Sequence, residues 1–188
     1  QNALKKKNYY ATYDSYAYSK ADVVVVDINL DVQKKSAANK DLEGYQVDMT
    51  PFKKAIEAIG SCCKEDVLVL VETTVPPGTS LKVVKPILQE ALKNRGLSTD
   101  KIKVGHSYER VMPGPKYIDS IQNFYRVFAG TDEQSAAAVE NFLRTVIRTD
   151  EYPLTKLGNT NATEMAKVLE NSIRTMNIAL MVEGSRFA

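Results

Sequence analysis

Residues 72–79 (ETTVPPGT) carry the strongest local signal for chemistry in this chain. They place the hydroxyls of Thr73 and Thr74 directly after a run of valine and leucine that is typical of a buried strand. Ligands of α/β proteins bind at the carboxyl ends of such strands. The alternative is a rigid turn between a strand and a helix, fixed by Pro-Pro-Gly and capped by Thr79. Composition alone favours that structural alternative.

A second loop, residues 106–114, also follows a strand pattern and carries Glu109. A carboxylate at that edge of the sheet could hold a water molecule or accept a proton, if partial burial raises its pKa. The alternative is a solvated pair between Glu109 and Arg110. His106 is the only histidine, and neither a metal site nor a catalytic triad can be assembled around it. We interpret His106 as a structural loop residue and expect no metal.

The last helical pattern places Glu164, Lys167 and Asn171 on one face, at i, i+3 and i+7. Lys167 and Asn171 could direct an ammonium and an amide at one ligand oxygen and so stabilise a developing oxyanion. The alternative is a surface Glu164–Lys167 pair worth roughly a few tenths of a kcal/mol. Cys62 and Cys63 have no histidine nearby in the sequence, so we interpret them as small buried apolar side chains and not as catalytic thiols.

The elements that must position these residues alternate between strands and helices. Strand patterns occupy residues 21–26, 66–71, 102–105 and 125–130, and helical patterns occupy residues 50–60, 81–92, 131–146 and 161–183. Residues 27–49 read as a polar loop before the first helix. This alternation predicts an α/β fold with a doubly wound parallel sheet.

Local signals predict how three of the helices begin or bend. Thr50 and Pro51 are a good helix entry, with the threonine as the cap and the proline in the first turn. Pro86 should kink its helix, because it lacks a backbone donor. Thr131 and Gln134 have the spacing of a capping box.

Composition limits the classes of protein to which the chain can belong. Its 188 residues are 44% hydrophobic and 26% charged, with a net charge of +2, as in a globular protein of one domain or slightly more. This charge gives no general attraction to nucleic acid, and no apolar run approaches the roughly eighteen residues of a membrane helix. Two adjacent cysteines cannot build a disulfide framework. We therefore expect a cytoplasmic protein without nucleic-acid or membrane partners.

The order and spacing of four sequence blocks resemble those of the UDP-glucose/GDP-mannose dehydrogenase family. The blocks are ADVVVV at 21–26, ETTVPPGT at 72–79, YERVMPG at 108–114, and EMAK at 164–167 with EN at 170–171. The resemblance implies a Rossmann-like NAD-binding fold. It also implies that NAD is the cofactor and that the C6 hydroxyl of a UDP-sugar is oxidised to a carboxylate by two hydride transfers, as a step in polysaccharide biosynthesis.

The resemblance also assigns roles to the site residues. Thr74 would lie beside the nicotinamide, with Thr73 in the same cofactor-binding segment. Glu109 would work with Thr74 on water or on a substrate proton, and Lys167 and Asn171 would steady the oxyanion. The loop around Glu109 is more similar to that of enzymes acting on UDP-N-acetylhexosamines than on UDP-glucose. A homodimer through the long C-terminal helix is expected, because apolar residues surround much of that helix.

Departures from the family pattern concern the two ends of the enzyme. The sequence contains neither the glycine-rich turn that holds the NAD pyrophosphate nor the Gly-Cys motif of the family's nucleophile, and Asn29-Leu30 replaces a Pro-Thr pair. The chain also begins without methionine. We expect the middle part of an enzyme that is inactive alone. Residues 1–152 would form a partial NAD-binding domain without its first strand, and residues 153–188 the first long helix of a central dimerisation domain.

Two other functions stay open. One is a non-catalytic relative that uses the same sheet and long helix as a binding or dimerisation module. The other is an NAD-dependent dehydrogenase of the β-hydroxyacid type, whose interdomain helix also presents lysine and asparagine four residues apart. Those enzymes usually carry a Gly-Gly pair in the substrate loop. This sequence has Pro77-Gly78 and no Gly-Gly pair, which argues against them.

Overall fold

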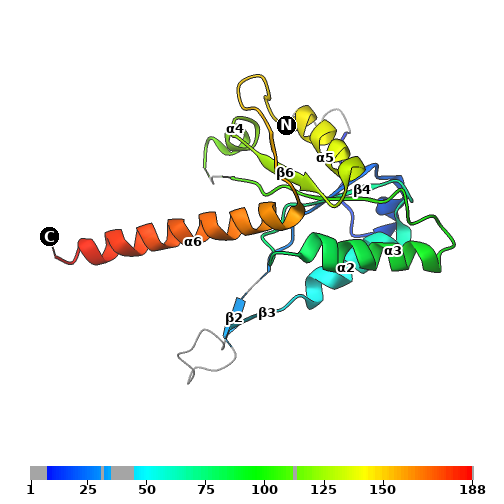
Figure 1. Cartoon of the computed structure of the whole chain (residues 1–188), viewed down its shortest axis with the longest axis horizontal. Coiled ribbons are helices and arrows are strands. Elements are labelled where there is room, and N and C mark those ends of the chain that lie inside the picture. The colour runs from blue at the N-terminus through cyan, green and yellow to red at the C-terminus, as the bar shows by residue number, and fades with distance from the viewer. Residues whose placement is uncertain (1–7, 31, 35–44, 112–113, 188) are drawn as a thin grey trace.

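The computed structural model describes residues 8–30, 32–34, 45–111 and 114–187 (Figure 1). Five of its strands form one sheet in the order β1-β4-β5-β6-β7, namely Val23–Val26, Leu68–Val71, Lys103–His106, Val127–Gly130 and Thr155–Lys156. The helical elements are η1 (Ser15–Lys20), α2 (Thr50–Cys62), η3 (Ser80–Val84), α3 (Lys85–Asn94), α4 (Tyr117–Gln122), α5 (Glu133–Val146) and α6 (Thr160–Gly184). The predicted Rossmann-like α/β class is therefore confirmed.

The central strand β4 is buried on both faces, as its continuous apolar run predicts. Val69 and Val71 pack with α2 and α3 on one face, and Leu68 and Leu70 pack with α5 on the other. Side chains alternate between the faces of a strand, so one four-residue segment serves both halves of the core. Figure 1 shows α2 and α3 together on one side of the sheet and α5 on the other.

One pair of strands differs from the predicted parallel sheet. β1, β4 and β5 are parallel, but β5 and β6 are antiparallel, with Gly105 opposite Gly130. A parallel pair needs a crossover that returns the chain to the starting edge of the sheet. Within its described residues, 107–111 and 114–126, the connection between β5 and β6 contains the short helix α4 and no other helix or strand, and it leads into β6 from the edge at which β5 ends. β7 is parallel to β6.

Several local predictions need correction. Thr50 is the first residue of α2 and not its cap; Met49 holds the cap position, and the Asp48 carboxylate accepts the N–H of Thr50 at 2.9 Å. α5 is capped by Asp132 and not by Thr131, because the carboxylate, one residue later, reaches the N–H of Ser135 at 2.7 Å.

Pro86 is accommodated by a change of helix type. The turn before it, η3, is a π-helix in which the N–H of Lys85 reaches the carbonyl of Ser80, and α3 then begins at Lys85. Pro86 thus lies in the first turn of α3, a position that proline tolerates.

Five of the described elements were not predicted, and two of them are η1 and β7. Strands β2 (Val32–Lys34) and β3 (Tyr45–Val47) form an antiparallel hairpin within the predicted polar loop, whose residues 31 and 35–44 lie outside the described residues. The fifth is α4. The short strand β7 also comes after the predicted boundary near residue 152, so the sheet continues to Lys156.

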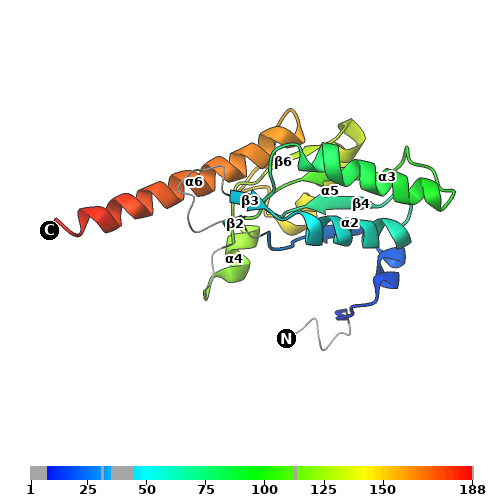
Figure 2. The ribbon, with the colours of Figure 1, turned by 90° about the horizontal axis from the view of Figure 1, so that it is seen from below.

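The long helix α6 begins at the sheet and leaves it. Its first turns pack against β5, β6 and η3, and the rest projects away from the body of the molecule (Figures 1 and 2). Asn159 caps it by accepting the N–H of Ala162. In the part of the chain that the structure describes, no helix has both the length and the apolar character needed to cross a membrane.

Candidate active site

Two clefts of about 370 Å³ each adjoin at the carboxyl ends of β1 and β4. Both are lined by the same three carboxylate residues, Asp27, Glu72 and Glu109. What we call the threonine cleft is completed by Ile28, Asn29, Leu30, Thr73 and Thr74. What we call the arginine cleft is completed by Val111, Tyr117, Ile121 and Arg126. The shared carboxylates make the two clefts one continuous site at the edge where α/β sheets bind ligands.

The two threonines of the 72–79 loop have different surroundings. The Thr73 hydroxyl is buried, accepts the N–H of Ile28 at 2.8 Å and donates to the carbonyl of Val26 at 3.2 Å. It thereby ties the loop after β1 to the end of β4. Thr74 is exposed on the wall of the threonine cleft. A ligand in this cleft would therefore meet Thr74, while the Thr73 hydroxyl shapes the wall from behind.

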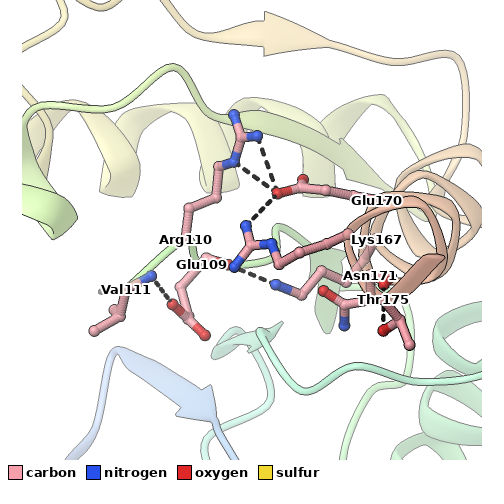
Figure 3. A network of polar contacts seen from close by, with 8 residues as sticks. Glu109, Arg110, Val111, Lys167, Glu170, Asn171 and Thr175 are labelled. Carbon is pink, nitrogen blue, oxygen red and sulfur yellow. Dashed lines mark hydrogen bonds and ion pairs between the residues drawn. The ribbon is translucent and has the colours of Figure 1, made fainter. Parts of the chain in front are cut away.

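Glu109 reaches both clefts from the loop after β5. Its carboxylate accepts the N–H of Val111, and its backbone carbonyl accepts a hydrogen bond of 3.0 Å from Lys167 Nζ (Figure 3). Arg110 does not pair with Glu109. Its guanidinium turns to Glu170 of α6 instead, with Nε and Nη2 at 3.1 and 3.0 Å from the carboxylate. The alternative interpretation of Glu109 and Arg110 as a solvated ion pair is therefore wrong. Met112 and Pro113 of this loop lie outside the described residues.

Lys167 is held in place from two sides. Besides the Glu109 carbonyl, the ring of Tyr108 lies beneath its ammonium group, at 5.1 Å from Nζ to the ring centroid. Asn171 is exposed one turn further along α6, and Figure 3 shows its amide on the side of the helix from which Lys167 projects. The structure thus joins Thr74 and Glu109 in one cleft and Lys167 to the Glu109 loop. Asn171 shares only the helix face.

A buried ion pair that sequence reasoning missed closes the back of the site. Arg126 Nη1 lies 2.9 Å from Glu72 Oε1 and also donates to the carbonyl of Ser107 at 3.3 Å. The Arg126 side chain is only 5% exposed. Burial raises the pKa of Glu72, and the guanidinium offsets part of that rise. Glu72 directly precedes the predicted threonines, but its partner is 54 residues away, so no local pattern marks the pair.

Glu164 also has contacts that the sequence did not predict. It is fully buried, and its two carboxylate oxygens accept the N–H groups of Ser80 at 2.8 Å and of Gly78 at 2.5 Å. The alternative of a surface Glu164–Lys167 pair is therefore wrong. The shared helix face was predicted correctly. The sequence did not predict that this face lies against two loops, the 72–80 loop and the loop that carries Glu109.

His106 and Cys63 are structural in this molecule. His106 is the last residue of β5 and not a loop residue, has no exposed surface, and shares a 2.8 Å hydrogen bond between Nδ1 and Thr163 Oγ1. Desolvation lowers the pKa of His106 to about 4, so the ring is neutral near pH 7. Cys63 is buried, and burial raises the pKa of its thiol, which disfavours the nucleophilic thiolate; Cys62 is partly exposed. The described residues contain no group of three or more His, Cys, Asp or Glu side chains able to hold a metal ion.

Comparison with known proteins decides the family. The model of the UDP-glucose/GDP-mannose dehydrogenase family, NAD binding domain, matches residues 1–147. The chain belongs to this family. The expected family, its Rossmann-like fold and NAD as the family's cofactor are thereby confirmed.

Relatives of the chain carry the names of nucleotide-sugar dehydrogenases. It is 33% identical to a UDP-N-acetyl-D-mannosamine dehydrogenase of Methanocaldococcus jannaschii, over 75% of this chain and 30% of the relative. It is 34% identical to a UDP-N-acetyl-D-glucosamine 6-dehydrogenase of Pseudomonas aeruginosa, over 75% of this chain and 32% of the relative. A crystal structure of an NDP-N-acetyl-D-galactosaminuronic acid dehydrogenase from Methanosarcina mazei Go1 superposes with a TM-score of 0.77 and 26% identity, over 96% of this chain and 35% of that one. The chain spans about a third of the length of the curated relatives it matches.

The charges of the site fit one end of NAD. Asp27 and Glu109 line the threonine cleft; carboxylates there would attract the cationic oxidised nicotinamide and accept hydrogen bonds from its ribose hydroxyls. The same carboxylates would repel a pyrophosphate. Asp27 and Thr74 could therefore hold the nicotinamide riboside end of the cofactor.

Proposed function

We propose that the protein containing this chain is an NAD-dependent nucleotide-sugar 6-dehydrogenase, which oxidises the C6 hydroxyl of a UDP-sugar to a carboxylate. The observation that carries the proposal is the convergence of Thr74 and Glu109 on one cleft, with Lys167 of α6 bonded to the Glu109 loop. The relatives named above favour a UDP-N-acetylhexosamine over UDP-glucose.

Each of these residues has a chemical task in the proposal. NAD, when bound, accepts the hydride from C6. Glu109, which lines the cleft, takes the proton of the hydroxyl or orients the attacking water. An ammonium group has three donors, and the Glu109 carbonyl occupies one of those of Lys167, so others can stabilise the oxyanion. Asn171 would supply a second donor from the same helix face.

The arrangement of domains and copies belongs to the same proposal. Residues 1–152 would form most of the NAD-binding domain, with β7 completing its sheet just beyond, and residues 153–188 would open the central domain. Exposed apolar side chains along α6 support a homodimer formed through this helix. We place the protein in the cytoplasm, at a step of polysaccharide biosynthesis; two free cysteines support a reducing compartment.

The test is a measurement of NADH formation by the full-length protein with UDP-N-acetylglucosamine, UDP-N-acetylmannosamine and UDP-glucose. We expect two molecules of NADH for each molecule of sugar, because conversion of an alcohol to a carboxylate removes four electrons. A protein that gives no NADH with any of the three sugars would contradict the proposal. If it still bound NAD and dimerised, that result would support the non-catalytic alternative.

A further inference from the structure

Glu164 is a buried carboxylate whose hydrogen-bond partners are backbone groups. It lies in the first turns of α6, has no exposed surface, and takes part in none of the ion pairs among the described residues. Burying an ionised carboxylate is costly unless strong donors replace its water. Here the replacements are the N–H groups of Gly78 and Ser80, at 2.5 and 2.8 Å, which lie 86 and 84 residues away in the chain.

The backbone that meets Glu164 is shaped for this contact. Gly78 has a φ of +96°, in the left-handed region that residues with a side chain rarely adopt. Ser80 begins the helical segment of η3 and α3, so its N–H belongs to the positive end of that segment. Glu164 therefore caps this helical segment from a different part of the chain.

The same contact connects two groups of site residues. Thr74 lies in the loop between two anchored points, with Thr73 bonded to the β1 loop at one end and Gly78 bonded to Glu164 at the other. On α6, Lys167 lies on the same helix face three residues after Glu164. Any displacement of α6 relative to the 72–80 loop must break the hydrogen bonds of Glu164.

We propose that Glu164 is a positioning residue, which fixes the 72–80 loop to α6 so that Thr74 and Lys167 keep one relative arrangement. The proposal rests on the proposed dehydrogenase function. Glu164 lines neither of the two clefts, so it acts through the loop and not on the substrate.

The informative substitution is Glu164→Gln in the full-length protein. Glutamine has the same shape, but it replaces one acceptor oxygen with an NH₂ group that would face a backbone N–H. The control is Glu183→Gln, which makes the same chemical change on the same helix, at an exposed residue paired with Arg186.

Hydrogen exchange followed by mass spectrometry measures how strongly Glu164 protects the amides of Gly78 and Ser80. In Glu164→Gln we expect the amides of Gly78 and Ser80 to exchange about tenfold faster or more, since hydrogen bonds to a charged acceptor are the strong ones. The amide of Lys82, which bonds to the Gly78 carbonyl, serves as a local reference. The Glu183→Gln protein should exchange as the wild type does.

Kinetics then distinguish a positioning role from a merely structural one. We expect kcat to fall by about tenfold to a hundredfold in Glu164→Gln, because small displacements of positioning groups have effects of that size. The KM for NAD should change by less than about threefold. A thermal midpoint that falls while kcat at low temperature stays at the wild-type value would overturn the proposal.

If the glutamine variant does not fold, the Glu164→Asp variant tests the positioning role instead. It keeps the charge but shortens the side chain by one methylene, so faster exchange confined to residues 78 and 80 with a lowered kcat supports the proposal. Wild-type exchange in an active enzyme overturns it and leaves the dehydrogenase function standing. An inactive wild-type protein whose Glu164 variants show the expected exchange supports the contact and contradicts the dehydrogenase function instead.

Discussion

At the scale of single residues, charged side chains of the site are held by hydrogen bonds, an ion pair and a contact with an aromatic ring. Lys167 is bonded to the Glu109 carbonyl and lies over Tyr108, and Glu72 is bonded to Arg126. These contacts hold the cationic groups in place before any ligand arrives, so little rearrangement is needed when charge develops. Burial makes such contacts stronger and also makes the loss of one partner more damaging.

The Lys167→Ala substitution tests the oxyanion role. In the full-length protein we expect turnover of the UDP-sugar to fall by at least about a hundredfold, because one preorganised donor at a developing oxyanion is worth roughly 3 kcal/mol. Lys156→Ala is the control. Lys156 forms an exposed ion pair with Glu133 and lines neither cleft. A loss below tenfold for Lys167→Ala, measured as kcat/KM, would contradict the role.

His106 predicts how stability depends on pH. Its pKa is lowered from the ordinary 6.5 to about 4 in the folded chain. Between these values the unfolded chain binds a proton that the folded chain does not, so the free energy of unfolding falls as the pH falls from about 6.5 to about 4. The full effect amounts to roughly 3 kcal/mol.

Urea unfolding at several pH values measures this dependence. The His106→Asn variant, which keeps a polar group near Thr163, should show a shallower slope than the wild type over that pH range. His106 is the only histidine, so no other imidazole contributes to the difference. Equal slopes in the two proteins would refute the assignment.

At the scale of elements, local patterns predicted what local forces determine. The continuous apolar run of β4 and the helical spacing of apolar residues in α2, α3, α5 and α6 each reflect the burial of one segment, so these elements were predicted to within a few residues. The direction of β6 and the Glu72–Arg126 pair depend on the path of the chain between distant segments, and no local pattern contains that information. For the site, the family resemblance assigned roles to Thr74, Glu109 and Lys167, and these roles stay predictions. The sequence contained no signal for the contacts of Glu164, because its partners are backbone groups of a distant loop.

The cap of α5 tests a contact between elements. Asp132 accepts the N–H of Ser135 and pairs with Lys85, the first residue of α3, at 2.8 Å. Burial alone would raise the pKa of Asp132, but the hydrogen bonds from Lys85 and Ser135 lower it to about 2. Asp132→Ala should reduce the free energy of unfolding by about 1–2 kcal/mol, measured with urea near pH 7.

The pH dependence and a control sharpen this prediction. The pKa is below its ordinary value of 3.8, so the stabilisation by Asp132 is complete above about pH 4 and is lost as the pH falls toward 2. The difference between wild type and Asp132→Ala should therefore shrink in that range. Glu133→Gln, next to the cap and 89% exposed in its side chain, should change stability by less than about 0.5 kcal/mol. An Asp132→Ala protein as stable as Glu133→Gln would show that the cap contributes nothing.

At the scale of the whole molecule, α6 presents two different faces. At about 100° per residue, Glu164, Lys167 and Asn171 lie on the side of the sheet and its loops. Nearly opposite is an apolar stripe whose side chains are 53–64% exposed, namely Leu169, Ile173, Met176 and Leu180. Near its C-terminal end the helix also carries exposed apolar side chains on other sides, namely Ile178, Met181 and Val182. A projecting helix with such a surface is typical of an element that is covered by a partner.

The expected partner of the stripe is a second copy of the protein. Ile173→Glu places a charge in the middle of the stripe, and burying an unpaired charge in an apolar interface is costly enough to dissociate a dimer. We expect sedimentation equilibrium to show a dimer for the full-length wild-type protein and a monomer for this variant. Thr175→Glu is the matched control, because it adds the same charge two residues away, on a side of α6 that lies outside the stripe. A dimer that persists in Ile173→Glu would contradict the assignment. A wild-type monomer that Ile173→Glu unfolds would instead show that the stripe packs against another part of the same protein, and α6 would then connect the site to that part within one copy.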